Sequence, residues 1–231
     1  MSESAQTGQA AGSRGLAAAA LWLLLAGLQV LAAFALGGGG TEKGEEPLYD
    51  YTLAAGSVVL YGILVGLTFW IASLYPDRSG ALGLRRFPPR TLWLVAGVIV
   101  VSLAVAAGLE PVLHAGEEQG LEPERWRPEK AVPFAVNAVV IVTVVPFAEE
   151  LFYRGLGVRA LRIFGPVVAV VGTALVFGFA HGILAALPVL AFFGVALAWL
   201  RLRTDSVWPG VVAHAAYNGL GVAAFFLASS S

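Results

Sequence analysis

The feature that most constrains this chain is a series of uninterrupted apolar runs, each about as long as a membrane-crossing helix. A helix needs ~20 residues to cross a hydrocarbon core ~30 Å thick. The first run covers residues 16–36 and contains no charged side chain. Further apolar spans lie at about residues 51–75, 91–108, 131–162, 166–187, 188–203 and 207–227. The sequence therefore predicts an all-α fold, a polytopic transmembrane bundle of about seven helices.

The composition agrees with this class of protein. The chain is 58% hydrophobic and only 13% charged, whereas a soluble domain is about half apolar and about a quarter charged. Its net charge of −1 gives no basic field of the kind that binds nucleic acid. There is no cysteine, which excludes disulfides, a thiol nucleophile and cysteine-ligated zinc. We therefore expect membrane lipid, and not nucleic acid, as a partner.

The amino-terminal segment is predicted to divide into a tail and a retained helix. Residues 1–15 are small and polar, and we expect them to be disordered. The apolar run at 16–36 has 21 residues, longer than the roughly 7–15 residues of a signal-peptide core. Residues 16–231 are therefore expected to form a single membrane domain.

The positive charges in the loops predict an orientation, because cytoplasmic loops carry an excess of lysine and arginine. With the amino terminus inside, ten basic residues fall in inside segments and four in outside segments. The ten are Arg14, Arg78, Arg85, Arg86, Arg90, Arg154, Arg159, Arg162, Arg201 and Arg203. The four are Lys43, Arg125, Arg127 and Lys130. We expect a multi-pass protein of the cell membrane with a cytoplasmic amino terminus.

Polar side chains interrupt the last four apolar spans. The ones that could act together are Glu149, Glu150, Arg154, His181, His214 and Asn218. A charge at the centre of a membrane helix costs ~2.5–3.5 kcal/mol on insertion scales. Such groups are tolerated where they face a polar cavity, pair with one another or lie near the interface.

The spacing of these residues predicts how they pair. Glu150 and Arg154 are four residues apart with the acid first, the favourable order for an ion pair along a helix. Glu149 is rotated by about 100° from Glu150, so we expect it to point elsewhere, with Tyr153 as its helical neighbour. One carboxylate can thus be neutralised by Arg154 while the other faces a cavity.

The next helices each add a pair of residues four apart. Phe177 and His181 share one face, so the aromatic ring can form a wall beside the imidazole. His214 and Asn218 project together from the last span. Three helices therefore supply one free carboxylate, two imidazoles and one amide.

These residues form three motifs in a recognisable order. Residues 149–154 fit E-E-x-x-x-R, residues 177–181 fit F-x-x-x-H, and residues 214–218 fit H-x-x-x-N. In this order on apolar spans they resemble the CPBP family, which includes CAAX prenyl endopeptidases of the Ras-converting type and their bacterial abortive-infection and bacteriocin-processing relatives. The resemblance covers residues 130–227, which we expect to be the catalytic core.

The resemblance implies a role for each motif residue. It implies that Glu149 is the general base that activates water, with His181 as its partner. His214 and Asn218 resemble the donors that stabilise the oxyanion, and each such donor is worth about 2.7–4 kcal/mol in the transition state. Glu150 and Arg154 resemble supporting residues behind the site, and Phe177 borders it. The implied substrate is a protein or peptide, either lipidated or not; prenylated tails and bacteriocin leaders both stay open.

Two other functions stay open at this point. No cofactor is expected for water activated by Glu149, but Glu149, His181 and His214 could instead ligate zinc, with Asn218 beside them. The same residues could also serve a proton relay, or a non-enzymatic immunity or scaffold protein. The H-E-x-x-H motif of helical zinc proteases does not occur. Counting 1.5 Å per residue also places His181 ~10 Å further out than Glu149 and His214.

Overall fold

The computed structural model describes residues 3–35, 47–115 and 126–229, and the regular structure of these ranges is entirely helical. Six of the described helical segments are long and apolar enough to cross a membrane. They are Gly12–Ala35, Tyr51–Ala72, Thr91–Leu113, Pro128–Phe164, Leu187–Thr204 and Trp208–Ser229. The predicted polytopic helical bundle is therefore confirmed.

Helix α9 (Pro166–Phe179) occupies the fifth of the seven predicted spans, and it is shorter than expected. It has 14 residues, which corresponds to about 21 Å of helix. The chain then turns through Gly182, whose φ of 72° lies in the left-handed region that favours glycine. The predicted span 166–187 therefore ends at Phe179, and His181 lies in the turn that follows.

Helix α1 (Glu3–Ala35) begins well before the first apolar run. Most of the segment that we expected to be a disordered tail is therefore helical. Ala5, Ala10 and Ala11 lie in this part of the chain, and alanine has the highest helix propensity. The candidate membrane span within this helix begins at Gly12.

A long segmented helix occupies the predicted span 131–162 and runs through the middle of the bundle. We call residues 131–161 the central helix. Its segments are α6 (Ala131–Val139), η3 (Val140–Val144), α7 (Val145–Glu149), η4 (Glu150–Gly157) and α8 (Val158–Leu161). Segments η3 and η4 are π-helical. The motif acids therefore lie where the helix widens after α7.

Pro146 accounts for the first widened turn. Proline has no N–H and its ring clashes with the carbonyl four residues earlier. The N–H of Val145 bonds to the carbonyl of Val140, five residues back, so the turn is wider than in an α-helix. Single π-turns within α-helices are frequent at functional sites. The proline thus sets the geometry of the helix just before Glu149.

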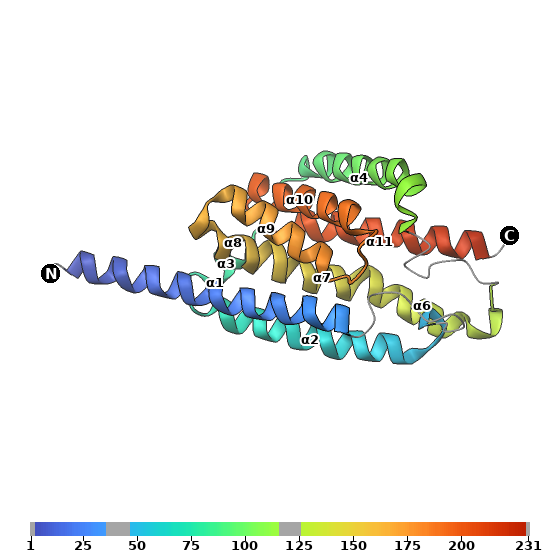
Figure 1. Ribbon diagram of the computed structural model, residues 1–231, viewed down its shortest axis with the longest axis horizontal. Helices are drawn as coiled ribbons and strands as arrows, with labels where there is room; N and C mark the ends of the chain where they lie inside the picture. Colours follow the sequence, from blue (N-terminus) through green and yellow to red (C-terminus); the bar gives the residue numbers. More distant parts are fainter. Residues whose placement is uncertain (1–2, 36–46, 116–125, 230–231) are drawn as a thin grey trace.

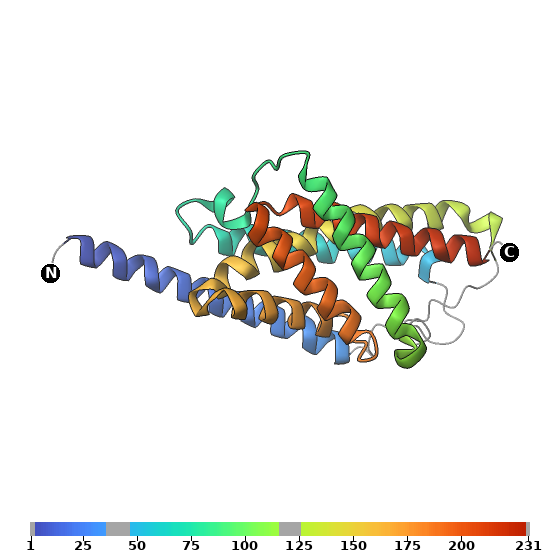
Figure 2. The ribbon, with the colours of Figure 1, turned by 90° about the horizontal axis from the view of Figure 1, so that it is seen from above.

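The other helices surround the central helix, as Figure 1 and Figure 2 show. Helices α1 and α2 (Tyr51–Ala72) lie along one side of it, and α10 (Leu187–Thr204) packs closely against α9. Helix α11 (Trp208–Ser229) runs beside η3 and α7, and α4 (Thr91–Leu113) crosses the outside of α10 and α11. Figure 1 also shows that α1 begins and α11 ends at opposite ends of the long axis.

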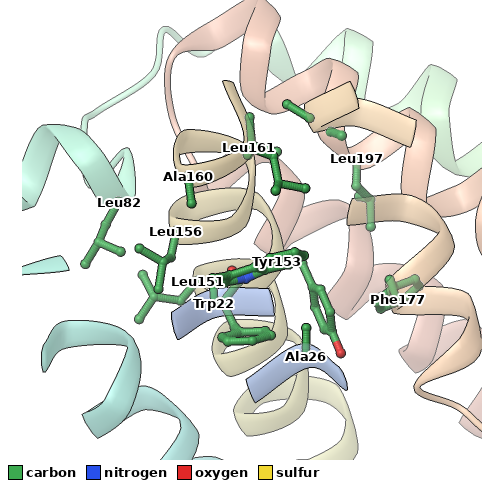
Figure 3. Packing of buried hydrophobic residues seen from close by; sticks show 14 of the residues in the cluster. Trp22, Ala26, Leu82, Leu151, Tyr153, Leu156, Ala160, Leu161, Phe177 and Leu197 are labelled. Carbon is green, nitrogen blue, oxygen red and sulfur yellow. The ribbon is translucent and has the colours of Figure 1, made fainter. Parts of the chain in front are cut away.

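The core is centred on segment η4 and α1. Trp22 of α1 is fully buried and its indole N–H donates to the carbonyl of Phe152, 3.0 Å away. Figure 3 shows Trp22 beside Leu151 and Tyr153, with Phe177 on the other side of Tyr153. Many large apolar side chains on the outer faces are exposed, as expected where lipid is the solvent. The packed centre of the bundle therefore holds the motif-bearing segment in place.

Candidate active site

Glu149 is the last residue of α7, and its two carboxylate oxygens have different surroundings. The residue is 7% exposed. Its Oε1 accepts a hydrogen bond from the hydroxyl of Tyr61 on α2, 2.7 Å away. Its Oε2 lies 3.8 Å from Nε2 of His214 and has no hydrogen-bond partner within the described part of the chain. One oxygen is thus fixed and the other is available to a further donor.

Glu150 and Arg154 form the ion pair that their spacing predicts, and both side chains are fully buried. Nη1 of Arg154 donates to Oε1 of Glu150 at 2.8 Å. The same oxygen is 3.2 Å from Nδ1 of His214, and Nη2 of Arg154 donates to the carbonyl of Gly194 at 3.4 Å. A buried charge is costly unless it is paired. The ion pair with Arg154 therefore compensates the buried charge of Glu150.

The two acids have different partners, as the spacing predicts, because Arg154 binds Glu150 and Tyr61 binds Glu149. Glu149 and Glu150 both approach His214, one at each ring nitrogen. The hydroxyl of Tyr153 donates to Gln29, 3.2 Å away, and not to Glu149. The predicted neighbour of Glu149 is thus replaced by Tyr61.

His214 is held between carboxylates and aromatic rings. The rings of Phe177 and Phe193 stand edge-on to the imidazole, with centroid distances of 5.7 and 5.4 Å. Because a carboxylate can only accept, Nδ1 of His214 donates to Glu150, and Nε2 is the nitrogen that faces Glu149. Gly210, one turn earlier on α11, leaves room for Glu150: a Cβ there would lie 2.6 Å from Oε2 of Glu150.

His181 lies beyond the end of α9, and its hydrogen bond fixes the ring tautomer. Its Nδ1 is 2.7 Å from the carbonyl of Phe177. A carbonyl only accepts, so Nδ1 carries the proton and Nε2 holds the lone pair of the neutral ring. The ring of Phe177 contacts both His181, at 4.7 Å, and His214, at 5.7 Å. Among the described residues, no hydrogen bond or ion pair joins His181 to Glu149.

Asn218 contacts the central helix at its first widened turn. Its Nδ2 donates to the carbonyl of Ile141 at 3.0 Å. In the wider turn, the partner of this carbonyl would be the N–H of residue 146, which is a proline. Asn218 therefore satisfies a carbonyl that the helix leaves without its own donor, and its second amide N–H stays available.

The structure thus brings Glu149, Glu150, Arg154 and His214 into one cluster and places His181 and Asn218 beside backbone carbonyls. Within the described ranges, no three His, Asp or Glu side chains form a group that could hold a metal ion. The zinc set that the sequence left open is Glu149, His181 and His214. As they stand, these side chains do not fit a zinc centre.

Sequence reasoning missed Tyr61, Phe193 and Gly210. Tyr61 contacts Glu149 from a helix that none of the motifs includes. A tyrosine within an otherwise apolar span is itself a signal, because a buried hydroxyl usually finds a hydrogen-bond partner. Phe193 and Gly210 lie in spans rich in similar residues, so the sequence has no mark that separates them from packing residues.

Comparison with known proteins gives one match. Residues 131–220 match the family described as type II CAAX prenyl endopeptidase Rce1-like. This segment begins with α6, ends within α11 and contains every residue of the three motifs. No curated protein and no solved structure matches the chain. The match agrees with the family resemblance carried by the motifs, and it confirms that residues 131–220 are Rce1-like.

Proposed function

We propose that this protein is an intramembrane endopeptidase that hydrolyses peptide bonds of membrane-associated or lipidated proteins. The observation that carries the proposal is the Glu149 carboxylate, with one oxygen held by Tyr61 and the other buried beside His214 without a hydrogen-bond partner among the described residues. The Rce1-like match supports an activity of the CAAX protease type. The nucleophile is water, so the absence of cysteine from the sequence is no obstacle.

In the first step, water attacks the scissile carbonyl carbon as Glu149 takes one of its protons. Oε2 is the accepting atom, because Oε1 is already bonded to Tyr61. His181 is the partner of this base in the proposal. The Nδ1–H of His181 donates to the carbonyl of Phe177, so its Nε2 can accept a hydrogen bond from the attacking water and orient it. General base catalysis by a positioned group contributes typically 10²–10⁴-fold in rate.

The attack places negative charge on the carbonyl oxygen, and His214 and Asn218 are proposed to stabilise it. Glu150, which is paired with Arg154, fixes the imidazole of His214 through Nδ1. When the ring is the imidazolium, Nε2 carries a second proton and can donate a hydrogen bond to the oxyanion. Asn218 has its second amide N–H for the same oxygen. The C–N bond breaks as Glu149 returns its proton to the amine nitrogen, and the products are a new carboxylate and a new amine.

The proposed substrate class follows from the position of the site and from the family. Glu149, His214 and Asn218 lie on helices long and apolar enough to span a membrane, so a substrate anchored in the bilayer reaches them with least reorganisation. The family name describes endopeptidases acting on CAAX prenyl proteins. We therefore propose a lipidated carboxyl-terminal tail as substrate, with bacteriocin leader peptides as the alternative.

The test uses purified full-length protein in liposomes and a farnesylated peptide with a fluorescent reporter. Glu149→Gln keeps the size of the side chain and removes the base, so the cleavage rate should fall by at least about 100-fold. His181→Ala should cause a similar loss. Glu129→Gln, a change of an exposed acid outside the cluster, is the matched control and should cleave normally.

Full cleavage by the folded Glu149→Gln protein would contradict the proposal. The non-enzymatic alternative predicts a different result in cells. If the protein is an immunity or scaffold factor, a strain carrying Glu149→Gln keeps the phenotype of the wild type. Loss of cleavage together with loss of the phenotype would instead link the biological role to hydrolysis.

A further inference from the structure

A second polar site lies at the end of the bundle where the central helix and α10 both stop. Here a pocket with a volume of about 140 Å³ is lined by Arg159, Arg162, Arg201 and Asp205, among others. Three arginines against one aspartate leave an excess of positive charge. Arg159 lies ten residues beyond Glu149 on the same helix, about 15 Å along its axis. The pocket is therefore separate from the proposed active site.

The guanidinium group of Arg201 is already in place. Its side chain is 7% exposed, and Nη1 binds Oδ1 of Asp205 at 2.9 Å. Its Nε has no hydrogen-bond partner within the described chain. The group packs against Gly83, where a Cβ would lie 2.5 Å from Nε and where φ is +68°. Glycine at this position thus permits both the turn and the close approach of the arginine.

The positive charges of the other two arginines, Arg159 and Arg162, are not neutralised by a carboxylate of the described residues. The guanidinium of Arg159 lies 4.7 Å from the ring centroid of Tyr75, which orients it by a cation–π contact. Asp205 is shared between Arg201 and Arg85, whose Nη1 is 2.7 Å away. Within the described ranges, neither Arg159 nor Arg162 has a carboxylate at ion-pair distance. The pocket is therefore preorganised for an anion that the described residues do not supply.

The level of the pocket in the bilayer points to the class of anion. Two candidate membrane spans end here, at Phe164 and at Thr204. The pocket residues thus lie in or just beyond the last turns of these spans, at the height of lipid head groups. Ile163 and Phe164, next to Arg162, are 43% and 53% exposed and offer an apolar surface for an acyl chain. Arginine forms bidentate hydrogen bonds with phosphate oxygens.

We propose that this pocket binds the phosphate group of an anionic phospholipid. Arg159 and Arg162 contact the phosphate oxygens, and Arg201 adds charge from the floor of the pocket. Basic side chains at a membrane surface each favour anionic lipid. Bound lipid would join the end of the central helix to the end of α10. The proposed lipid site is in a different part of the chain from the hydrolytic site. Its test therefore does not depend on the proposed hydrolytic function.

The test is native mass spectrometry of the full chain in neutral detergent, titrated with phosphatidylglycerol, phosphatidylcholine or inorganic phosphate. Phosphatidylglycerol should bind most tightly. Arg159→Gln and Arg162→Gln should each weaken this binding by about fivefold, the factor for one basic group at a membrane surface. Arg203→Gln, a change of an exposed arginine on α10 that does not line the pocket, should leave binding unchanged.

Three results would overturn the proposal. An equal loss in Arg203→Gln, or no loss in both pocket variants, would show that the basic surface attracts lipid without a specific site. Tighter binding of inorganic phosphate than of phosphatidylglycerol would identify a free phosphate site. Equal binding of phosphatidylglycerol and phosphatidylcholine would contradict recognition of an anionic head group. Arg159 and Arg162 are exposed, so both variants should unfold at the wild-type temperature, and this is checked first.

Discussion

The contact between Tyr61 and Glu149 joins the proposed base to a helix outside the Rce1-like segment. A hydrogen bond to a charged group is worth about 1.5–3 kcal/mol, and here it holds one carboxylate oxygen while the other faces His214. Tyr61 is a positioning residue in this account, because it acts through Glu149 and does not exchange a proton with the substrate. The amino-terminal helices would then contribute to the reaction and not only to anchoring.

Removing the Tyr61 hydroxyl should slow the chemical step. In Tyr61→Phe we expect kcat to fall by about tenfold or more, with little change in KM, because the ring remains and only the hold on Glu149 is lost. Tyr51→Phe, on the exposed face of the same helix, is the control and should keep wild-type kinetics. The cleavage assay with the farnesylated peptide measures both constants. An unchanged kcat in Tyr61→Phe would show that the hydrogen bond does not position the base.

At the scale of elements, the close approach of α11 to η4 decides whether the buried cluster forms. Gly210 permits it, because a Cβ there would overlap Glu150. Glu150, Arg154 and His214 are all buried, and breaking such a buried pair costs about 3–5 kcal/mol. The cluster therefore depends on the position of the helix backbone as much as on the side chains that form it.

Gly210→Ala should push α11 away from Glu150. The predicted effect is a loss of about 1–3 kcal/mol in the free energy of unfolding, the typical cost of an overpacked contact, together with a lower cleavage rate. Gly221→Ala is the matched control, since a Cβ at that position of α11 meets no atom within 4 Å. Thermal unfolding in detergent measures the stability. Equal unfolding temperatures for Gly210→Ala and the wild type would contradict the predicted overlap between a Cβ at position 210 and the Glu150 carboxylate.

The sequence predicted these elements where one physical signal dominates. Long apolar runs located the membrane spans, and the four-residue spacing of Glu150 and Arg154 predicted their ion pair. The prediction was wrong for the end of α9: the apolar run continues beyond Phe179, but the helix ends there and the chain turns through Gly182. Tyr61 could not be paired with Glu149, because a contact between residues 88 positions apart depends on how whole helices pack.

At the scale of the molecule, the arrangement of the helices supports the proposed orientation. Figure 1 shows that α1 begins and α11 ends at opposite ends of the bundle. The pocket arginines lie at the end where α1 begins and α10 stops, which the excess of positive charge predicts to be cytoplasmic. We therefore propose a cytoplasmic amino terminus, with the phosphate-binding pocket facing the inner leaflet.

The orientation can be tested by labelling single cysteines, because the natural chain contains none. Arg78→Cys and Glu129→Cys place a thiol at opposite ends of the bundle. In intact cells, a membrane-impermeant maleimide should label Glu129→Cys, whereas Arg78→Cys should react only after permeabilisation. The reverse pattern would place the amino terminus outside and the pocket in the outer leaflet.

Cleavage in oxygen-18 water tests whether Glu149 activates water to cut a peptide bond. The purified protein and the farnesylated peptide are incubated in labelled water, and the products are read by mass spectrometry. The new carboxylate of the wild-type product should gain one labelled oxygen, and folded Glu149→Gln should release no labelled product over the same time. Labelled product from Glu149→Gln at the wild-type rate would contradict this role of Glu149.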